Sequence, residues 1–378
     1  MQRQPDFENF RRTILRQGPP GPVPFFELFA DPGMVEAVLE EKFPVNLHRY
    51  IEEPVLEVSE DELKGLVKSL DMYVRFCREV GYDYVFMVTG LSLQRNLKAA
   101  ADTAGAQNWP GGQRYWQDEE SGPIQSWADF ESYPWPKAED LRHVALEYVS
   151  NVLPEGMKAA AFGFGGIFEN STWLMGLQPF SYALQDQPDL VEAISQRVGE
   201  LSAATCAQVV AIDNVDMVFL SDDLGYYSGT LVSPNVIRQY VLPHYKKIVD
   251  IAHKAGKLVV FHSCGNMYKL MDELIDDIGV DAKHSFEDKI LPVEEAYRRW
   301  GDRVAILGGV DMDLIGRGTE EQVRSRTRQI LEVCGVKGMG YCLGTGNTAA
   351  NYLPRQNYLA MLDEGRRWNR EHFGEPSM

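Results

Sequence analysis

A histidine and a cysteine two residues apart, with another cysteine 78 residues further on, are the residues of this chain best suited to metal chemistry. His262 and Cys264 follow the apolar run 257–261, and Cys342 ends the run 338–342. Side chains alternate faces along a strand, so His262 and Cys264 point the same way, about 7 Å apart along the chain. One imidazole and two thiolates, with no evident fourth protein ligand, are the pattern of a catalytic zinc with an open position. We therefore expect an enzyme with these three metal ligands. Two buried thiols and a hydrogen-bonded histidine, without metal, are the structural alternative.

The elements that must position these residues are short apolar runs alternating with amphipathic helical patterns. Such alternation predicts an α/β fold, a (β/α)8 TIM barrel whose active site collects at the carboxyl ends of the strands. The three predicted ligands stand at such ends. We expect one domain, 1–378, with an N-terminal extension. The eight predicted strands are 22–29, 84–89, 158–164, 217–221, 258–263, 280–285, 304–309 and 338–343.

A long tryptophan-rich insertion, 104–137, interrupts the alternation. It contains Trp109, Trp116, Trp127 and Trp135, and loops of this length in a compact protein are usually functional or mobile. An aromatic lid that excludes water from the barrel mouth is one interpretation. A surface excursion held down by its tryptophans is the other, and the sequence leaves both open.

Composition excludes some classes of function. The formal net charge is −18 over 378 residues, which disfavours binding to nucleic acid or to an anionic membrane surface. The amino terminus has no apolar stretch of signal-peptide type, and no apolar run approaches the roughly 18 residues that span a bilayer. The five cysteines are an odd number, which favours reduced thiols over a disulfide framework. We therefore expect a cytoplasmic protein.

Several polar residues follow predicted strands and are candidates for catalysis. Asp222 and Asp223 come after the fourth strand, where one of them could orient His262 or donate a proton to a leaving oxygen. Glu169 comes after the third strand and is a third catalytic candidate. For all three acids, helix capping or ordinary loop structure is the alternative.

Further residues are candidates for substrate binding, with loop polarity or core packing as the alternative for each. Phe164, Phe168, Trp173 and Tyr226 could form an apolar wall for a small aromatic molecule. The polar candidates at the carboxyl ends of the strands are Asn170, His284, Asp311 and Asn347.

Four features of the chain resemble the uroporphyrinogen decarboxylase superfamily. They are the segment FGGIFENSTWLMG at 164–176, YPWP at 133–136, the strand end at 309–311 and the His-x-Cys at 262–264. The superfamily has two main branches, true decarboxylases and zinc methyltransferases that move methyl groups to or from corrinoids. The His-x-Cys with its distant cysteine is similar to the second branch.

The decarboxylase branch fits the residues poorly. Its members carry an arginine-rich N-terminal motif for the tetrapyrrole carboxylates, and an aspartate after the next strand. The corresponding stretch here, 21–28, has no arginine, and Thr89-Gly90 stands where the aspartate would be. A substrate with many carboxylates would also be repelled by so acidic a chain.

The resemblance therefore implies a zinc-dependent methyltransferase that works with a corrinoid (cobalamin). The chain has no Asp-x-His-x-x-Gly motif, so the corrinoid is expected on a separate corrinoid-binding protein, beside a small-molecule methyl donor. We favour O-demethylation of a methoxylated, aromatic donor. Methyl transfer from methylcobalamin to a thiol is the alternative within this class, and a non-catalytic barrel that binds a small molecule is the alternative outside it. The direction of transfer and the oligomeric state, a homodimer included, are left open.

Overall fold

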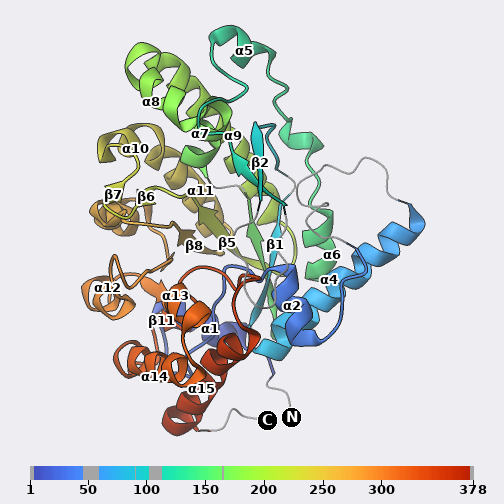
Figure 1. Cartoon of the computed structure of the whole chain (residues 1–378), viewed down its shortest axis with the longest axis vertical. Coiled ribbons are helices and arrows are strands. Elements are labelled where there is room, and N and C mark those ends of the chain that lie inside the picture. Colours follow the sequence, from blue (N-terminus) through green and yellow to red (C-terminus); the bar gives the residue numbers. More distant parts are fainter. Residues whose placement is uncertain (1–3, 46–58, 90, 102–112, 164–165, 375–378) are drawn as a thin grey trace.

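A parallel sheet forms the centre of the computed structural model, which describes residues 4–45, 59–89, 91–101, 113–163 and 166–374 (Figure 1). Its seven strands lie in the order β1-β4-β5-β8-β9-β10-β11, so the predicted α/β class is confirmed. Seven of the eight predicted strands are present, each with both ends within three residues of the predicted ones. They are β1 (Tyr84–Val88), β4 (Lys158–Phe162), β5 (Val215–Ser221), β8 (Leu258–His262), β9 (Ala282–His284), β10 (Ala305–Leu307) and β11 (Tyr341–Cys342).

Helices follow the strands and surround the sheet (Figure 1). No helix in the described part of the chain is long and apolar enough to cross a membrane. The α-helices are α1 (Phe7–Leu15), α2 (Pro32–Leu39), α4 (Glu60–Val80), α5 (Trp127–Ser132), α6 (Val144–Val152), α7 (Ile167–Met175), α8 (Leu177–Asp186), α9 (Pro188–Val209), α10 (Pro234–Tyr240), α11 (Leu242–Lys254), α12 (Val293–Trp300), α13 (Met312–Arg317), α14 (Glu320–Ile330) and α15 (Arg355–Phe373). Short 3-10 or π segments are η1 (Ala138–Asp140), η2 (Tyr268–Leu270), η3 (Glu273–Ile278) and η4 (Leu331–Gly335).

The predicted first strand, 22–29, is an extended segment at the edge of the sheet. Isolated bridges join Phe25 to Leu343 and Ala30 to Ala349, but among the described residues no ladder joins the segment to β1. The prediction of a fully closed (β/α)8 barrel is therefore not met. Pro22 and Pro24 lack the N–H group that a ladder needs, which explains the weak pairing.

A side chain spans the gap between this segment and β1. The hydroxyl of Tyr84 accepts a hydrogen bond from the backbone N–H of Glu27 at 2.9 Å and donates to the carbonyl of the same residue. The rings of Phe26 and Tyr84 also lie 6.0 Å apart. The two edges are thus held together by side chains in place of a backbone ladder.

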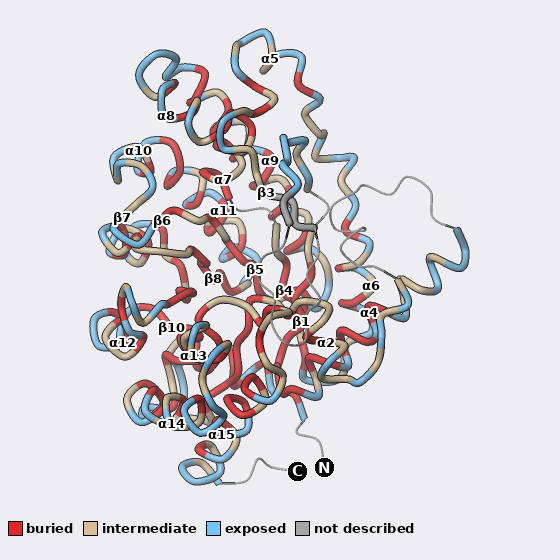
Figure 2. The backbone as a smooth tube through the Cα atoms, in the orientation of Figure 1, coloured by how far each residue is buried: buried red, intermediate tan, exposed pale blue. Residues whose placement is uncertain are grey.

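The inner face of the sheet closes on one apolar cluster. Because strands from both ends of the sheet contribute to it, the sheet must curl until its edges approach each other. Figure 2 shows the strands as buried chain at the centre of the molecule. Helix α1, the predicted N-terminal extension, adds Phe7, Phe10 and Ile14 to this cluster. The strand and edge residues in it are Phe26, Leu28, Tyr84, Phe86, Ala160, Met217, Phe219, Leu258, Val260, Ala282, Ala305, Leu307 and Cys342.

The described part of the tryptophan-rich insertion packs on itself and on the rest of the fold, where the backbone N–H of the buried Ile124 donates to the Leu174 carbonyl at 2.8 Å. This part starts in β3 (Gln113–Gln117), which pairs with β2 (Leu97–Ala101), and continues into α5. Phe130 contacts Trp127 and Trp135 edge to face, with ring centroids 5.6 and 5.5 Å apart. Arg197 of α9 lies over the Trp135 ring at 5.8 Å. These contacts favour an excursion held down by its aromatic residues, while Trp109 lies outside the described residues.

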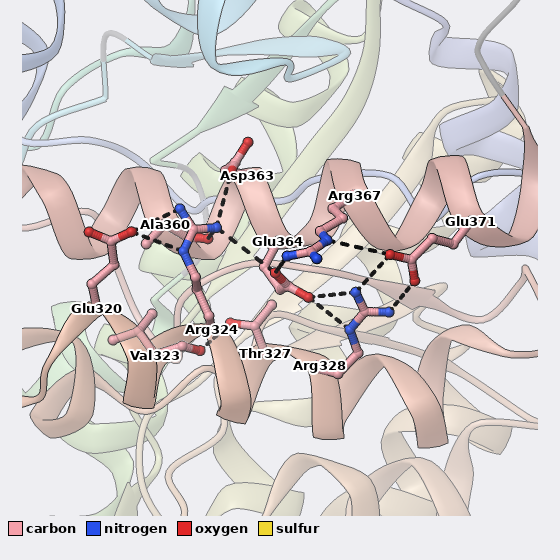
Figure 3. Close-up of polar contacts among 10 residues, drawn as sticks. All are labelled: Glu320, Val323, Arg324, Thr327, Arg328, Ala360, Asp363, Glu364, Arg367 and Glu371. Carbon is pink, nitrogen blue, oxygen red and sulfur yellow. Dashed lines mark hydrogen bonds and ion pairs between the residues drawn. The ribbon is translucent and has the colours of Figure 1, made fainter.

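An ion network joins the last two long helices, α14 and α15 (Figure 3). Glu364, whose side chain is 6% exposed, accepts a hydrogen bond from Arg328 Nε at 2.7 Å and lies 3.9 Å from Arg324. Breaking one partner of a buried pair leaves an uncompensated charge, so this network fixes how α15 closes the fold.

The buried carboxyl of Glu27 should make stability depend on pH. Its Oε1 accepts a hydrogen bond from the Thr345 hydroxyl at 2.7 Å, and burial raises its pKa from 4.5 to about 8. The folded protein therefore holds a proton that the unfolded chain releases, so the contribution of Glu27 to stability is fully present below about pH 4.5 and falls as the pH rises from about 4.5 to about 8.

We expect Glu27→Gln to flatten this dependence, with a divergence from wild type of roughly 3 kcal/mol between pH 5 and 8. Urea unfolding of both proteins across this range measures the effect, and Glu131→Gln, an exposed change on α5, is the control. Parallel curves for Glu27→Gln and wild type would contradict the assignment.

Candidate metal centre

The site lies where three adjacent strands end. In the parallel register Ser221 of β5 pairs with His262 of β8, and His262 pairs with His284 of β9. The chain leaves β5 through Asp223 and leaves β8 through Cys264. The carboxyl ends of these strands therefore bring polar side chains from separate loops to one place, as in other sheets of this kind.

Asp223, His262 and Cys264 form a group that could hold a metal ion. Their ligand atoms all lie within 4.8 Å of one another. His262 Nε2 is 3.6 Å from Cys264 Sγ and 3.8 Å from an Asp223 carboxylate oxygen. His262 is buried, whereas the Asp223 side chain is 42% exposed, so the group opens to solvent on its carboxylate side. Nitrogen, sulfur and carboxylate oxygen are all ligands that zinc accepts, and three of them leave a position free.

Cys342 does not join this group. Its side chain is fully buried in the interior cluster, and burial raises its thiol pKa well above the usual range. The next influence on that pKa is the negative charge of Asp83, which precedes β1 at the amino end of the sheet. Strands in a curled sheet are tilted, so residues in register several strands apart lie at different heights. The structure thus unites two of the three predicted ligands and places Asp223 beside them.

The histidine pair determines which nitrogen of His262 faces the group. His284 Nε2 lies 3.3 Å from the carbonyl oxygen of Thr345, which can only accept, so this nitrogen carries the proton. The Nδ1 atoms of the two histidines are 2.9 Å apart. Burial lowers the pKa of His262 to about 3 and that of His284 well below its usual value, so both rings are neutral. His262 therefore donates from Nδ1, and its Nε2 lone pair points to Cys264 and Asp223. His284, predicted to contact substrate, instead positions His262.

Two glycines allow the ligand loops to touch. Gly265 has φ +72°, and a Cβ there would lie 2.4 Å from the Gly225 carbonyl oxygen. A Cβ on Gly225 would lie 2.7 Å from the Cys264 carbonyl oxygen. The backbone N–H of Cys264 also donates to an Asp223 carboxylate oxygen at 2.8 Å. Asp223 is therefore held beside Cys264 by a contact between backbones.

The other two predicted acids have different surroundings. Asp222 is buried and accepts from the backbone N–H of Phe168 at 2.7 Å, from that of Glu169 at 2.8 Å and from the Tyr245 hydroxyl at 2.6 Å. Its carboxylate caps the start of α7 and is not free for His262. Burial, and then the charges of Asp223 and Asp222, raise the pKa of Glu169 well above its usual range. Glu169 is thus a carboxyl near Asp223 whose affinity for a proton is raised by its surroundings.

Several predicted substrate contacts have structural roles. Asn170 donates to the Gly166 carbonyl at 2.8 Å, and Asp311 caps α13 by accepting from two backbone N–H groups. Trp173 lies under the Arg95 guanidinium at 4.2 Å, and Tyr226 is 66% exposed. Phe164 lies outside the described residues. The expected aromatic wall is therefore not assembled among the residues that the structure describes.

Two residues contact the ligand sulfur. Asn347 Nδ2 lies 3.2 Å from Cys264 Sγ, and Ser285 Oγ lies 3.9 Å from it. We predicted Asn347 as a substrate contact, and the structure places its amide on the sulfur. Ser285 was not predicted, because a serine at the end of an apolar strand carries no signal of its own.

The fold and this site together define an α/β protein of the curled parallel-sheet class with a metal-ligand group at its carboxyl-end loops. Residues 120–368 match the family model described as Uroporphyrinogen decarboxylase (URO-D). Since the match covers more than half of the chain, the protein belongs to that family.

Sequence comparison finds relatives named as methyltransferases and as decarboxylases. A methylated-thiol–coenzyme M methyltransferase of Methanosarcina mazei is 31% identical over 134 residues, 35% of this chain and 32% of the relative. A uroporphyrinogen decarboxylase of Coxiella burnetii is 26% identical over 263 residues, 64% of this chain and 67% of the relative. A methylcobamide:CoM methyltransferase MtbA of Methanosarcina acetivorans is 26% identical over 162 residues, 42% and 43% of the two chains. The chain thus spans about a third of the first relative's length.

A solved structure, a methyltransferase from Methanosarcina mazei, has the same fold. Its TM-score is 0.66 at 14% identity, covering 95% of this chain and 98% of the other.

Removing the Nδ1 acceptor beneath His262 should weaken metal binding. We expect His284→Phe, which keeps a ring of similar size, to lower zinc affinity by about tenfold to a hundredfold, because His262 is then free to adopt the other tautomer or to rotate. Competition with a chromophoric chelator measures the affinity, and His244→Phe on α11 is the matched control. Equal affinities in His284→Phe and wild type would show that the pair does not orient the ligand.

Proposed function

We propose that this protein is a zinc-dependent methyltransferase that moves a methyl group from a methylcobamide to a thiol. The observation that carries the proposal is the solvent-open group of Asp223, His262 and Cys264. The names of two relatives, both methyltransferases that act with coenzyme M, support the thiol as acceptor.

The donor set suits this chemistry. A zinc dication with one thiolate, one carboxylate and one neutral imidazole has zero formal charge, and zinc bound there would lower the pKa of a thiol in its open position. His262 is held with Nε2 toward the metal position, and Asp223 supplies the ligand on the open side. Glu169 would take the proton that the incoming thiol loses, since burial and the two neighbouring aspartates raise its pKa and make its carboxylate a stronger base.

Decarboxylation is the other activity named among the relatives, and the residues here favour it less. The segment 21–28 has no arginine to hold a polycarboxylate, and the carboxylate of Asp223 stands on the open side of the site. A polyanionic substrate would be repelled by it.

O-demethylation of a methoxylated aromatic, our first expectation, has less support than the thiol reaction. It depended on an aromatic wall at the site. Of the described candidates for that wall, Trp173 is stacked on an arginine, Tyr226 is exposed and Phe168 is buried in the core.

A separate corrinoid-binding protein would deliver the methylcobamide, because this chain has no corrinoid-binding motif. We also place the protein in the cytoplasm, where Cys264 stays reduced. All five cysteines are free in the structure, which agrees with a reducing compartment.

Metal analysis tests the ligand set. We expect about one zinc per chain in wild type, as for a single catalytic site, and its loss in Cys264→Ser and Asp223→Asn. Cys342→Ser should retain zinc, because that thiol lies in the apolar interior. Loss of zinc in Cys342→Ser with retention in Asp223→Asn would restore the two-thiolate site predicted from sequence. Zinc-loaded wild type should then demethylate methylcobalamin in the presence of 2-mercaptoethanesulfonate, followed by absorbance of the cobalamin product.

The role of Glu169 predicts a characteristic pH profile. In Glu169→Gln we expect kcat/KM near pH 7 to fall about a hundredfold at unchanged zinc content, because the thiol has lost its proton acceptor. The rate should recover as the pH rises above the pKa of the free thiol, which then arrives already deprotonated. A loss of equal size at every pH would contradict proton transfer to Glu169.

A further inference from the structure

The Cys264 sulfur has two hydrogen-bond donors besides the metal position. Asn347 Nδ2 approaches it to 3.2 Å and Ser285 Oγ to 3.9 Å. The donors come from two different segments, one after β11 and one after β9. Neither belongs to the loop that carries Asp223, so the sulfur is contacted by segments separate from that candidate ligand.

Both donors are held in place by further contacts. The backbone N–H of Asn347 lies 3.4 Å from the Thr345 hydroxyl, which is itself bonded to Glu27. The buried Lys283 donates to the carbonyls of Ser263 and Ser285 at 3.0 and 3.1 Å. This fixes the backbone on both sides of the Ser285 to Cys264 contact. The polar contacts of the sulfur are therefore built into the structure.

A methyl-transfer site with a thiolate ligand has two sulfurs that could react. The substrate thiolate and Cys264 would bind the same metal, within reach of the same methyl group. Attack by Cys264 would form an S–CH3 bond while the electron pair of the broken carbon–cobalt bond stays on cobalt. The resulting thioether is a poor zinc ligand, and each such event would inactivate one site.

We propose that Asn347 and Ser285 protect Cys264 from methylation and so direct the methyl group to the substrate; this inference rests on the proposed function. A metal-bound thiolate keeps two further lone pairs. The Asn347 N–H and the Ser285 O–H face these pairs, which lowers the nucleophilicity of the ligand sulfur. The thiolate of a substrate in the open position lacks these donors and stays reactive.

The test uses methyl iodide, which needs no corrinoid partner. Zinc-loaded wild type, Asn347→Leu and Ser285→Ala are incubated with it, and the bound zinc is measured on the same samples. Peptide mapping by mass spectrometry then gives the rate at which the Cys264 peptide gains one methyl group. Asn151→Leu, the same change on the exposed face of α6, is the matched control. Asn347→Ser, whose side chain is too short to reach the sulfur, replaces Asn347→Leu should that variant not fold.

We expect Cys264 to be methylated about tenfold faster in Asn347→Leu at equal zinc occupancy, a factor that corresponds to ~1.4 kcal/mol. Ser285→Ala should show a smaller increase, because its contact is longer, and Asn151→Leu should match wild type. Equal rates in wild type and Asn347→Leu would overturn the proposal.

Failure of this inference can be distinguished from failure of the proposed function. A wild type that binds zinc but transfers no methyl to thiols refutes the function, while the alkylation ratio still reports on the sulfur. If Asn347→Leu and Asn347→Ser both lose zinc while Asn151→Leu retains it, the proposal is also overturned, because Asn347 is then needed to hold the metal.

Discussion

The hydrogen bond between the Nδ1 atoms of His262 and His284 is the interaction on which the site depends. It exists because β8 and β9 run parallel in a register that sets the two rings side by side, and because the Thr345 carbonyl fixes the proton on the far nitrogen of His284. Without it the lone pair of His262 would have no fixed direction, since an imidazole exchanges tautomers freely. The register of two strands thus determines that His262 Nε2 carries the free lone pair. Burial keeps both rings neutral, so the arrangement persists.

Much of this architecture could be predicted from the sequence, and the failures have physical reasons. Apolar runs located seven strands, and strand alternation correctly paired His262 with Cys264, because both depend only on local geometry. The closed barrel failed at 22–29, where prolines remove ladder donors and a tyrosine side chain fills the gap. Cys342 was expected at the metal because the ends of all strands were assumed to lie at the same level of the sheet. In a curled sheet, height also depends on tilt, which one sequence does not encode locally.

The proposed third ligand, Asp223, shows a different limit. Asp223 was one of two adjacent aspartates, and the sequence left open which of them reaches His262. Asp223 is the one that reaches His262, because Asp222 accepts hydrogen bonds from the amino end of α7 and from Tyr245. These partners lie up to 54 positions away in the sequence. Replacing a thiolate with a carboxylate keeps the formal charge around a zinc dication at zero. It would also give a bound metal a harder ligand than the thiolate expected from the sequence.

The contact between Gly225 and Gly265 has a consequence for how members of this family are sorted. A side chain at either position would collide with the opposite backbone and part the loop of Asp223 from that of Cys264. A homologue could therefore keep Asp223, His262 and Cys264 and still lose the site through one substitution at Gly225 or Gly265. Comparing the ligand residues alone would not detect this loss. Conversely, a relative with arginines and no cysteine could share the whole scaffold. Activity within this fold is better diagnosed by whether two backbones can touch than by which polar residues are present.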